Sequence, residues 1–216
     1  MNVNQHPQKI NYYLACEKEI QRNEGRLPKL LLHSCCAPCS SAVLEYLSPH
    51  FDITLFYFNP NITPEEEYRK RVAELHRLVS EAPYPNPVRI VEGRYDSGEF
   101  FRMAQGLEAL PEGGQRCYRC YRLRLEETAK QAAADGYEYF TTTLSVSPYK
   151  NAQKLNAIGS ELSAQYGVKY LLSDFKKKDG YRRSIELSAQ YGLYRQNYCG
   201  CVFSKAQREN ALSHSV

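Results

Sequence analysis

Short apolar runs alternate with segments of helical periodicity along this 216-residue chain. Buried strands are predicted by the apolar and β-branched runs at 30–33, 53–58, 88–91, 139–144 and 169–172. Helical patterns lie between and after them, at 43–47, 63–79, 100–104, 121–134, 151–166 and 183–191. Because parallel strands are usually joined through helices, this alternation predicts an α/β fold with a parallel sheet covered by helices on both faces. Ligands of such sheets gather at the carboxyl ends of the strands.

The start of the second helix carries its own signals. Thr63 precedes Pro64, Glu65 and Glu66. This order predicts Thr63 as the N-cap, Pro64 as the first helical residue and a first turn whose acidic side chains favour the helix dipole.

The sequence also limits where the protein is expected to be located and what it is expected to bind. Residues 1–7 are polar and lack the apolar core of a secretory signal, and no apolar stretch approaches the roughly 18 residues of a membrane span. We therefore expect no membrane association and a cytoplasmic location, where thiols stay reduced. The net charge of +4 permits nucleic-acid binding without establishing it.

Seven of the eight cysteines are grouped. Cys16 stands alone in an expected N-terminal helix and is interpreted as a small buried hydrophobic residue. The others form three short clusters: Cys35, Cys36 and Cys39; Cys117 and Cys120; Cys199 and Cys201. In a reducing compartment, such grouping predicts metal ligands rather than disulfides.

The spacing of the cysteines bears on which metal they bind. The pair Cys117 and Cys120 alone suits zinc and iron–sulfur clusters equally. Adjacent Cys35 and Cys36, and the tight Cys199-Gly-Cys201 segment, are unlike the chelating pairs of structural zinc sites. Seven thiolates also exceed one four-ligand centre. A split into four and three predicts one closed cluster and one metal with an open, catalytic position.

Five ordered motifs carry a family resemblance. They lie at 33–39 (HSCCAPC), 117–124 (CYRCYRLR), 141–148 (TTTLSVSP), 174–177 (DFKK) and 194–201 (YRQNYCGC). Together they resemble the QueH-type epoxyqueuosine reductases over about residues 28–204. The resemblance implies an enzyme that reduces epoxyqueuosine in tRNA to queuosine without cobalamin, in a Rossmann-like fold similar to that of the ATP pyrophosphatases. No phosphate-binding loop of the SGGxDS or GxxxxGK[ST] type is present, so we do not expect ATP use.

The resemblance also implies the cofactors, partners and domain bounds. The seven grouped cysteines would hold a [4Fe-4S] cluster and a second mononuclear iron. The partners would be tRNA carrying epoxyqueuosine and an external low-potential electron donor. We expect a helical N-terminal extension at 1–27, a single metal-binding catalytic domain at 28–205 and a C-terminal tail at 206–216.

Two further residues are candidates for catalysis. His33 ends a strand beside the first cysteines, where it would orient ligands or deliver a proton; the alternative is a hydrogen-bonded core histidine. Asp174 follows the fifth strand, where it would line the site or cap a turn.

The assignment of individual cysteines stays open, although we expect Cys35, Cys39 and Cys201 at the lone iron, because adjacent cysteines point different ways. The alternative functions are a tRNA sulfur transferase of related fold and a zinc-stabilised RNA-binding module. The sequence does not identify the electron donor, the proton donor or the oligomeric state.

Overall fold

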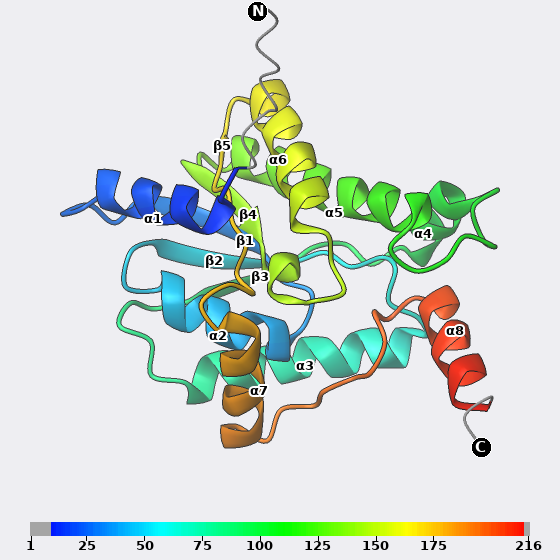
Figure 1. Ribbon diagram of the computed structural model, residues 1–216. Coiled ribbons are helices and arrows are strands. Elements are labelled where there is room, and N and C mark those ends of the chain that lie inside the picture. Colours follow the sequence, from blue (N-terminus) through cyan, green and yellow to red (C-terminus); the bar gives the residue numbers. More distant parts are fainter. Residues whose placement is uncertain (1–9, 214–216) are drawn as a thin grey trace, which may run out of the picture.

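The predicted parallel α/β fold is confirmed by the structure, a computed structural model that describes residues 10–213. Five strands form one sheet: β1 (Lys29–His33), β2 (Asp52–Tyr57), β3 (Arg89–Glu92), β4 (Tyr139–Thr142) and β5 (Lys169–Tyr170). All neighbouring strands are parallel, in the order β3-β2-β1-β4-β5 (Figure 1). The order reverses between β1 and β4, and such a switch point is where doubly wound sheets bind their ligands.

Helices cover both faces of this sheet (Figure 1). Their bounds are α1 (Tyr12–Arg22), α2 (Ala37–Leu47), α3 (Glu65–Glu81), α4 (Ser97–Ala104), α5 (Gln115–Ala134), α6 (Ala152–Tyr166), α7 (Gly180–Gln190) and α8 (Val202–Ser213). Helices α2, α3 and α7 lie on one side of the sheet, and α5 and α6 lie on the other. Among the described residues, no helix is long and apolar enough to cross a membrane.

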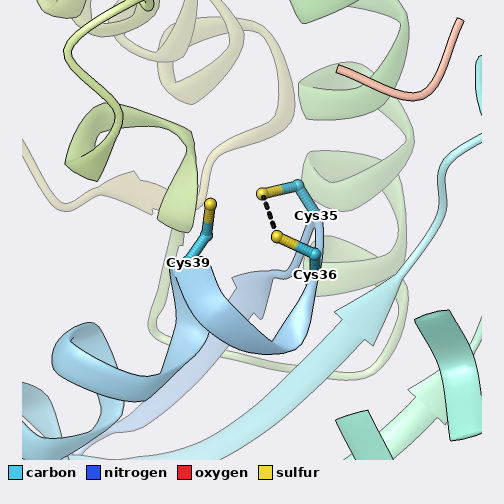
Figure 2. A group of neighbouring side chains, drawn as sticks. All are labelled: Cys35, Cys36 and Cys39. Atoms are coloured by element: carbon cyan, nitrogen blue, oxygen red, sulfur yellow. Dashed lines mark hydrogen bonds between the residues drawn. The ribbon is translucent and has the colours of Figure 1, made fainter. Parts of the chain in front are cut away.

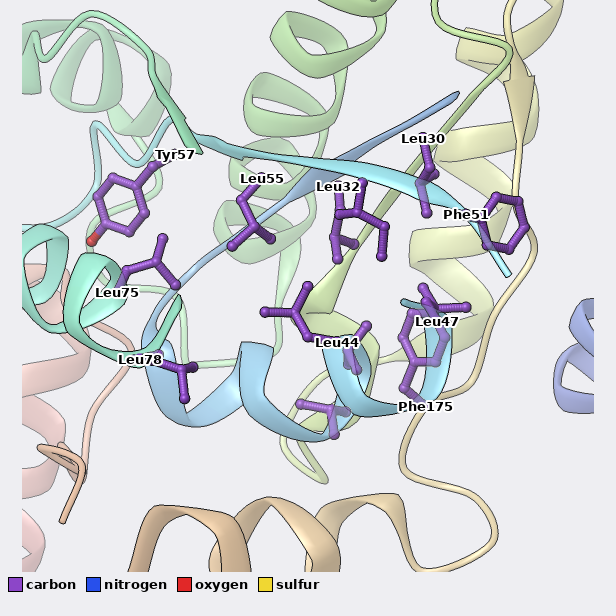
Figure 3. Close-up of a cluster of buried hydrophobic side chains, with 14 of the residues drawn as sticks. Leu30, Leu32, Leu44, Leu47, Phe51, Leu55, Tyr57, Leu75, Leu78 and Phe175 are labelled. Atoms are coloured by element: carbon purple, nitrogen blue, oxygen red, sulfur yellow. The ribbon is translucent and has the colours of Figure 1, made fainter. Parts of the chain in front are cut away.

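Strand β1, at the centre of the sheet, contributes side chains to both halves of the core. Leu30 and Leu32 pack among α2 and α3, whereas Leu31 between them packs among α5 and α6, because successive strand side chains point to opposite faces. Figure 3 shows Leu44, Leu75 and their neighbours packed together in the half of the core that contains Leu30 and Leu32. Both faces of β1 are therefore buried, which explains why its sequence is continuously apolar rather than alternating.

Several element boundaries differ from the sequence expectations. Helix α3 has Pro64 as its N-cap and begins at Glu65, so Thr63 is not the cap that the sequence predicted. The strand expected at 139–144 ends at Thr142 and continues as a 3₁₀ helix, Thr143–Val146. Helix α5 begins at Gln115, six residues before the expected start, so that both cysteines of its motif lie in its first two turns.

The terminal segments are only partly described. Residues 1–9 and 214–216 lie outside the described residues, and so does the segment 1–7 for which we expected no secretory signal. Within the expected extension, α1 packs on the core through buried Cys16, and the Tyr139 hydroxyl donates to Glu19 at 2.6 Å. At the other end, α8 crosses the expected boundary at 205, so most of the expected tail is helical.

Candidate metal centre

The first three grouped cysteines converge at the carboxyl end of β1. Cys36 is the N-cap of α2, and Cys39 lies in the first turn of that helix. The sulfurs of Cys35, Cys36 and Cys39 all lie within 4.8 Å of one another, and the Sγ atoms of Cys35 and Cys36 are 3.8 Å apart (Figure 2). A helix N-terminus stabilises thiolates through its dipole and free N–H groups. This group, called the cysteine triad below, can supply three ligands to one metal.

A second group gathers from two distant segments. One small cavity, called the four-cysteine cavity below, is lined by Cys117, Cys120, Cys199 and Cys201. The first pair lies at the start of α5, and the second pair lies immediately before α8. The backbone N–H of Ser204, in the first turn of α8, donates to Cys201 Sγ at 3.4 Å. All eight cysteines of the chain are free thiols in the structure, which leaves both groups available as ligands.

Buried cations surround these sulfurs. Arg71, Arg116 and Arg124 are among the largest fully buried side chains, and Lys150 is buried as well. Arg124 forms no ion pair with a carboxylate of residues 10–213; its Nε donates to the Cys120 carbonyl at 3.3 Å. A buried guanidinium needs a counter-charge, because burial removes its hydration. Since Arg124 lines the four-cysteine cavity, anionic sulfur is the counter-charge that the site offers it.

The same cations act on the thiols electrostatically. Burial raises the pKa of the Cys199 thiol, but the Lys150 ammonium and the Arg124 guanidinium outweigh it, and the net pKa is lowered. The pKa of Cys36 falls well below its ordinary value, chiefly through thiol hydrogen bonds from Cys35 and Cys39. Each group thus contains a thiol that favours the thiolate form, and thiolates are the form that binds metals.

A larger cavity of about 470 Å³ opens beside the triad. All three triad cysteines line it, together with Tyr149 and with residues late in the chain such as Arg195 and Arg208. Glu112, Lys150 and Cys199 line both this cavity and the four-cysteine cavity, so the two adjoin at these residues. A ligand in the larger cavity would therefore touch the triad while lying next to the four-cysteine cavity.

Comparison with known proteins identifies the family of this chain. Residues 30–207 match the family model described as Epoxyqueuosine reductase QueH. The chain belongs to the QueH family. Its members are oxidoreductases, and this protein is therefore an enzyme of that class.

Individual QueH relatives are similar over most of this chain. The protein from Streptococcus pyogenes serotype M1 is 44% identical over 208 residues, which cover 94% of this chain and 80% of that relative. The Staphylococcus epidermidis protein is 45% identical, covering 91% of this chain and 85% of its own length. The Thermotoga maritima protein is 36% identical, covering 83% and 91% respectively. All three are named Epoxyqueuosine reductase QueH.

The two catalytic candidates, His33 and Asp174, have partners other than the grouped cysteines. His33 is fully buried; its Nδ1 is 2.9 Å from Thr142 Oγ1 and its Nε2 is 3.1 Å from the Phe58 carbonyl oxygen. Burial lowers the His33 pKa to about 3, so the ring is neutral. Asp174 accepts from Lys176 Nζ at 2.8 Å. Neither residue lines the two cavities, and the surroundings of His33, buried with a partner for each ring nitrogen, are those of the alternative, a hydrogen-bonded core histidine.

The cysteine grouping differs from one sequence expectation. Cys36, and not Cys201, lies with Cys35 and Cys39, because Cys201 lines the four-cysteine cavity. The chain path explains the difference: Cys35 and Cys36 stand at one helix start, where both sulfurs turn toward Cys39 (Figure 2).

The residues around the four-cysteine cavity fit the iron–sulfur cluster that the family resemblance implies. Four thiols are the ligand set of a [4Fe-4S] cluster. Buried Nη2 atoms of Arg116 and Arg124, both in the cavity wall, have no hydrogen-bond partner among residues 10–213. Such donors need an acceptor, and anionic cluster sulfur would be one.

Sequence reasoning missed the buried cations. Arg116, Cys120, Arg124 and Thr128 recur every four residues and all belong to the buried face of α5. Two arginines on the same helical face as a cysteine expected to bind metal are the signal that would have identified them, because charged side chains are rarely fully buried without a partner.

Proposed function

We propose that this chain reduces epoxyqueuosine in tRNA to queuosine, with a [4Fe-4S] cluster in the four-cysteine cavity and a single iron at the cysteine triad. The observation that carries the proposal is the division of seven cysteines into groups of four and three beside one cavity, in a QueH-family chain. Four ligands complete the coordination of a cluster, whereas three leave one position for the substrate.

The reaction determines what the site must provide. Deoxygenation of an epoxide consumes two electrons and two protons, breaks both C–O bonds of the ring and gives an alkene and water. When bound, the cluster supplies electrons singly from an external low-potential donor, and the lone iron supplies a Lewis acid for the epoxide oxygen. The protein positions the substrate in the larger cavity and balances the negative charge of the sulfur ligands with Arg71, Arg124 and Lys150.

The mouth of the larger cavity has features suited to RNA. Tyr149 lines the cavity with 61% of its surface exposed, and the Arg208 guanidinium lies 5.0 Å from the centre of its ring. Unpaired bases stack on exposed aromatic rings, and a neighbouring arginine strengthens such contacts. Tyr149 therefore contacts a base of the tRNA next to or at the modified nucleoside.

Tyr149→Ala is expected to weaken binding of the substrate tRNA about tenfold, because stacking on one aromatic side chain contributes about 1–3 kcal/mol per base. Fluorescence anisotropy with labelled tRNA measures the change. The matched control is Tyr149→Phe, which keeps the ring and should bind like the parent. Equal affinities of the Ala and Phe variants would remove Tyr149 from the RNA contact.

The whole proposal is tested by anaerobic purification followed by metal analysis and turnover. About five irons and about four labile sulfides per chain are expected. Under strong reducing conditions, mass spectrometry of digested tRNA should follow the loss of one oxygen from epoxyqueuosine. A protein that holds its metals but leaves the substrate unchanged contradicts the reductase proposal.

The same measurements address the alternatives. A zinc-stabilised RNA-binding module would be colourless, with stoichiometric zinc and no sulfide. A tRNA sulfur transferase would add sulfur to the RNA, which mass spectrometry detects as a gain in mass. A cytoplasmic location stays a prediction, consistent with a site built from reduced thiols.

A further inference from the structure

A buried amide, that of Asn61, lines the four-cysteine cavity. Asn61 follows β2 and is 1% exposed. Both of its side-chain polar atoms, Nδ2 and Oδ1, are buried and make no hydrogen bond within residues 10–213. The side chain lines the same small cavity as Cys117, Cys120 and their two partners. Its neighbour Asn59, by contrast, is satisfied: Nδ2 donates to the Ser34 carbonyl at 2.8 Å, and Oδ1 accepts from Arg124.

An unsatisfied buried amide is costly, because it has lost its hydrogen bonds to water and gained none in return. Each such group in a folded protein calls for an explanation, and hydrogen bonding to a bound ligand is one. Other donors at this cavity also have no hydrogen-bond partner in the described part of the chain: Arg116 Nη2, the Tyr121 hydroxyl and Arg124 Nη2 belong to residues that line it with Asn61. A cavity rich in unused donors suits an anionic guest with several acceptor atoms.

The backbone holds Asn61 in place beside two of the cysteines. The Thr63 N–H donates to the Gly200 carbonyl at 3.0 Å, which joins this loop to the Cys199–Cys201 segment. The Tyr95 hydroxyl donates to the Ile62 carbonyl at 2.9 Å. Asn61 is thus fixed before any ligand arrives, as expected for a residue that orients or tunes a metal centre.

We propose that Asn61 donates a hydrogen bond from Nδ2 to a sulfur of the cluster in the four-cysteine cavity and thereby raises its reduction potential. The inference rests on the proposed cluster. A donor to cluster sulfur stabilises the reduced state more than the oxidised state, because reduction adds negative charge to the sulfurs. Asn61 is a positioning residue for the cluster and touches no substrate.

The test compares Asn61→Asp and Asn61→Leu, which remove the donor with little change in volume. Anaerobic potentiometric titration monitored by electron paramagnetic resonance measures the midpoint potential of the bound cluster. Both variants should have lower potentials, with an expected change of about tenfold in the one-electron equilibrium constant, or about 59 mV. Asp should lower the potential at least as far as Leu, because ionisation adds a negative charge.

The matched control is Thr54→Val. Thr54 is also buried, and its side-chain oxygen has no hydrogen-bond partner among the residues that the structure describes, but it lies within β2 and does not line the cavity. Its variant should keep the parent potential. Unchanged potentials in both Asn61 variants would overturn the inference while leaving the proposed cluster intact, whereas a parent protein without labile sulfide would overturn the proposed cluster itself.

A third variant, Asn61→Ser, is needed if the Asp and Leu variants fail to assemble the cluster, since no potential could then be measured. If the Asp and Leu variants fold, as circular dichroism reports, but hold no cluster, recovery of the cluster in the Ser variant would support the donor role. Failure of the Ser variant to hold a cluster would assign Asn61 a packing role and overturn the inference.

Discussion

Cys120→Ala and Cys199→Ala are each expected to abolish the visible absorption of the cluster and substrate turnover together. Each removes one of the four thiols that line the four-cysteine cavity, and a [4Fe-4S] cluster needs all four. Cys36→Ala is expected to act differently, because its sulfur belongs to the cysteine triad. That variant should keep the cluster absorption, lose about one iron per chain and stop turnover. Iron and sulfide analysis, absorbance and mass spectrometry of the tRNA product measure the three effects.

Cys16→Ala is the control for these variants. Cys16 is buried in α1 and packs in the apolar core among residues of α2 and neighbouring strands. Its replacement should leave colour and turnover unchanged and cost only the packing of one small side chain. If Cys36→Ala lost the cluster, or Cys120→Ala retained it, the division into four and three would be wrong.

Gly200→Ala is expected to lower both stability and cluster content. Gly200 has φ +111°, which side-chain-bearing residues rarely adopt, and an added Cβ would lie 2.9 Å from Ile62 Cγ1 and 3.0 Å from Arg71 Nη1. Backbone strain costs about 1–3 kcal/mol and overpacking a further ~1–3 kcal/mol. The shift would also displace the cysteines on either side, so cluster loading should fall. Urea unfolding under anaerobic conditions and sulfide analysis measure the two effects.

Gly25→Ala separates strain from crowding. Gly25 also has positive φ, +78°, but an added Cβ there meets nothing within 4 Å. Its variant should lose only about 1–2 kcal/mol from the left-handed backbone and should keep its cluster. Equal losses at the two positions would show that the surroundings of Gly200 do not matter to the centre.

The fold class could be predicted because it depends on local patterns. The apolar runs that became β1 and β2 are continuous, since parallel strands are buried on both faces. The helix that follows the first cysteines was predictable from its periodicity. The boundaries of the elements were less predictable. Pro64 is the cap of α3, and β4 ends at Thr142. Caps and strand ends depend on neighbouring backbone that periodicity does not describe.

The sequence by itself determined that the chain builds a parallel α/β fold and carries seven grouped cysteines, because strand and helix periods and cysteine spacing are local properties. Only the tertiary structure decided which cysteines meet. Cys117 and Cys199 are far apart along the chain, yet they share a cavity because α5 and the segment before α8 come together there. The tertiary structure also decided that Arg124 and Asn61 are buried at this cavity, since burial depends on packing between elements rather than on the residues of any one of them.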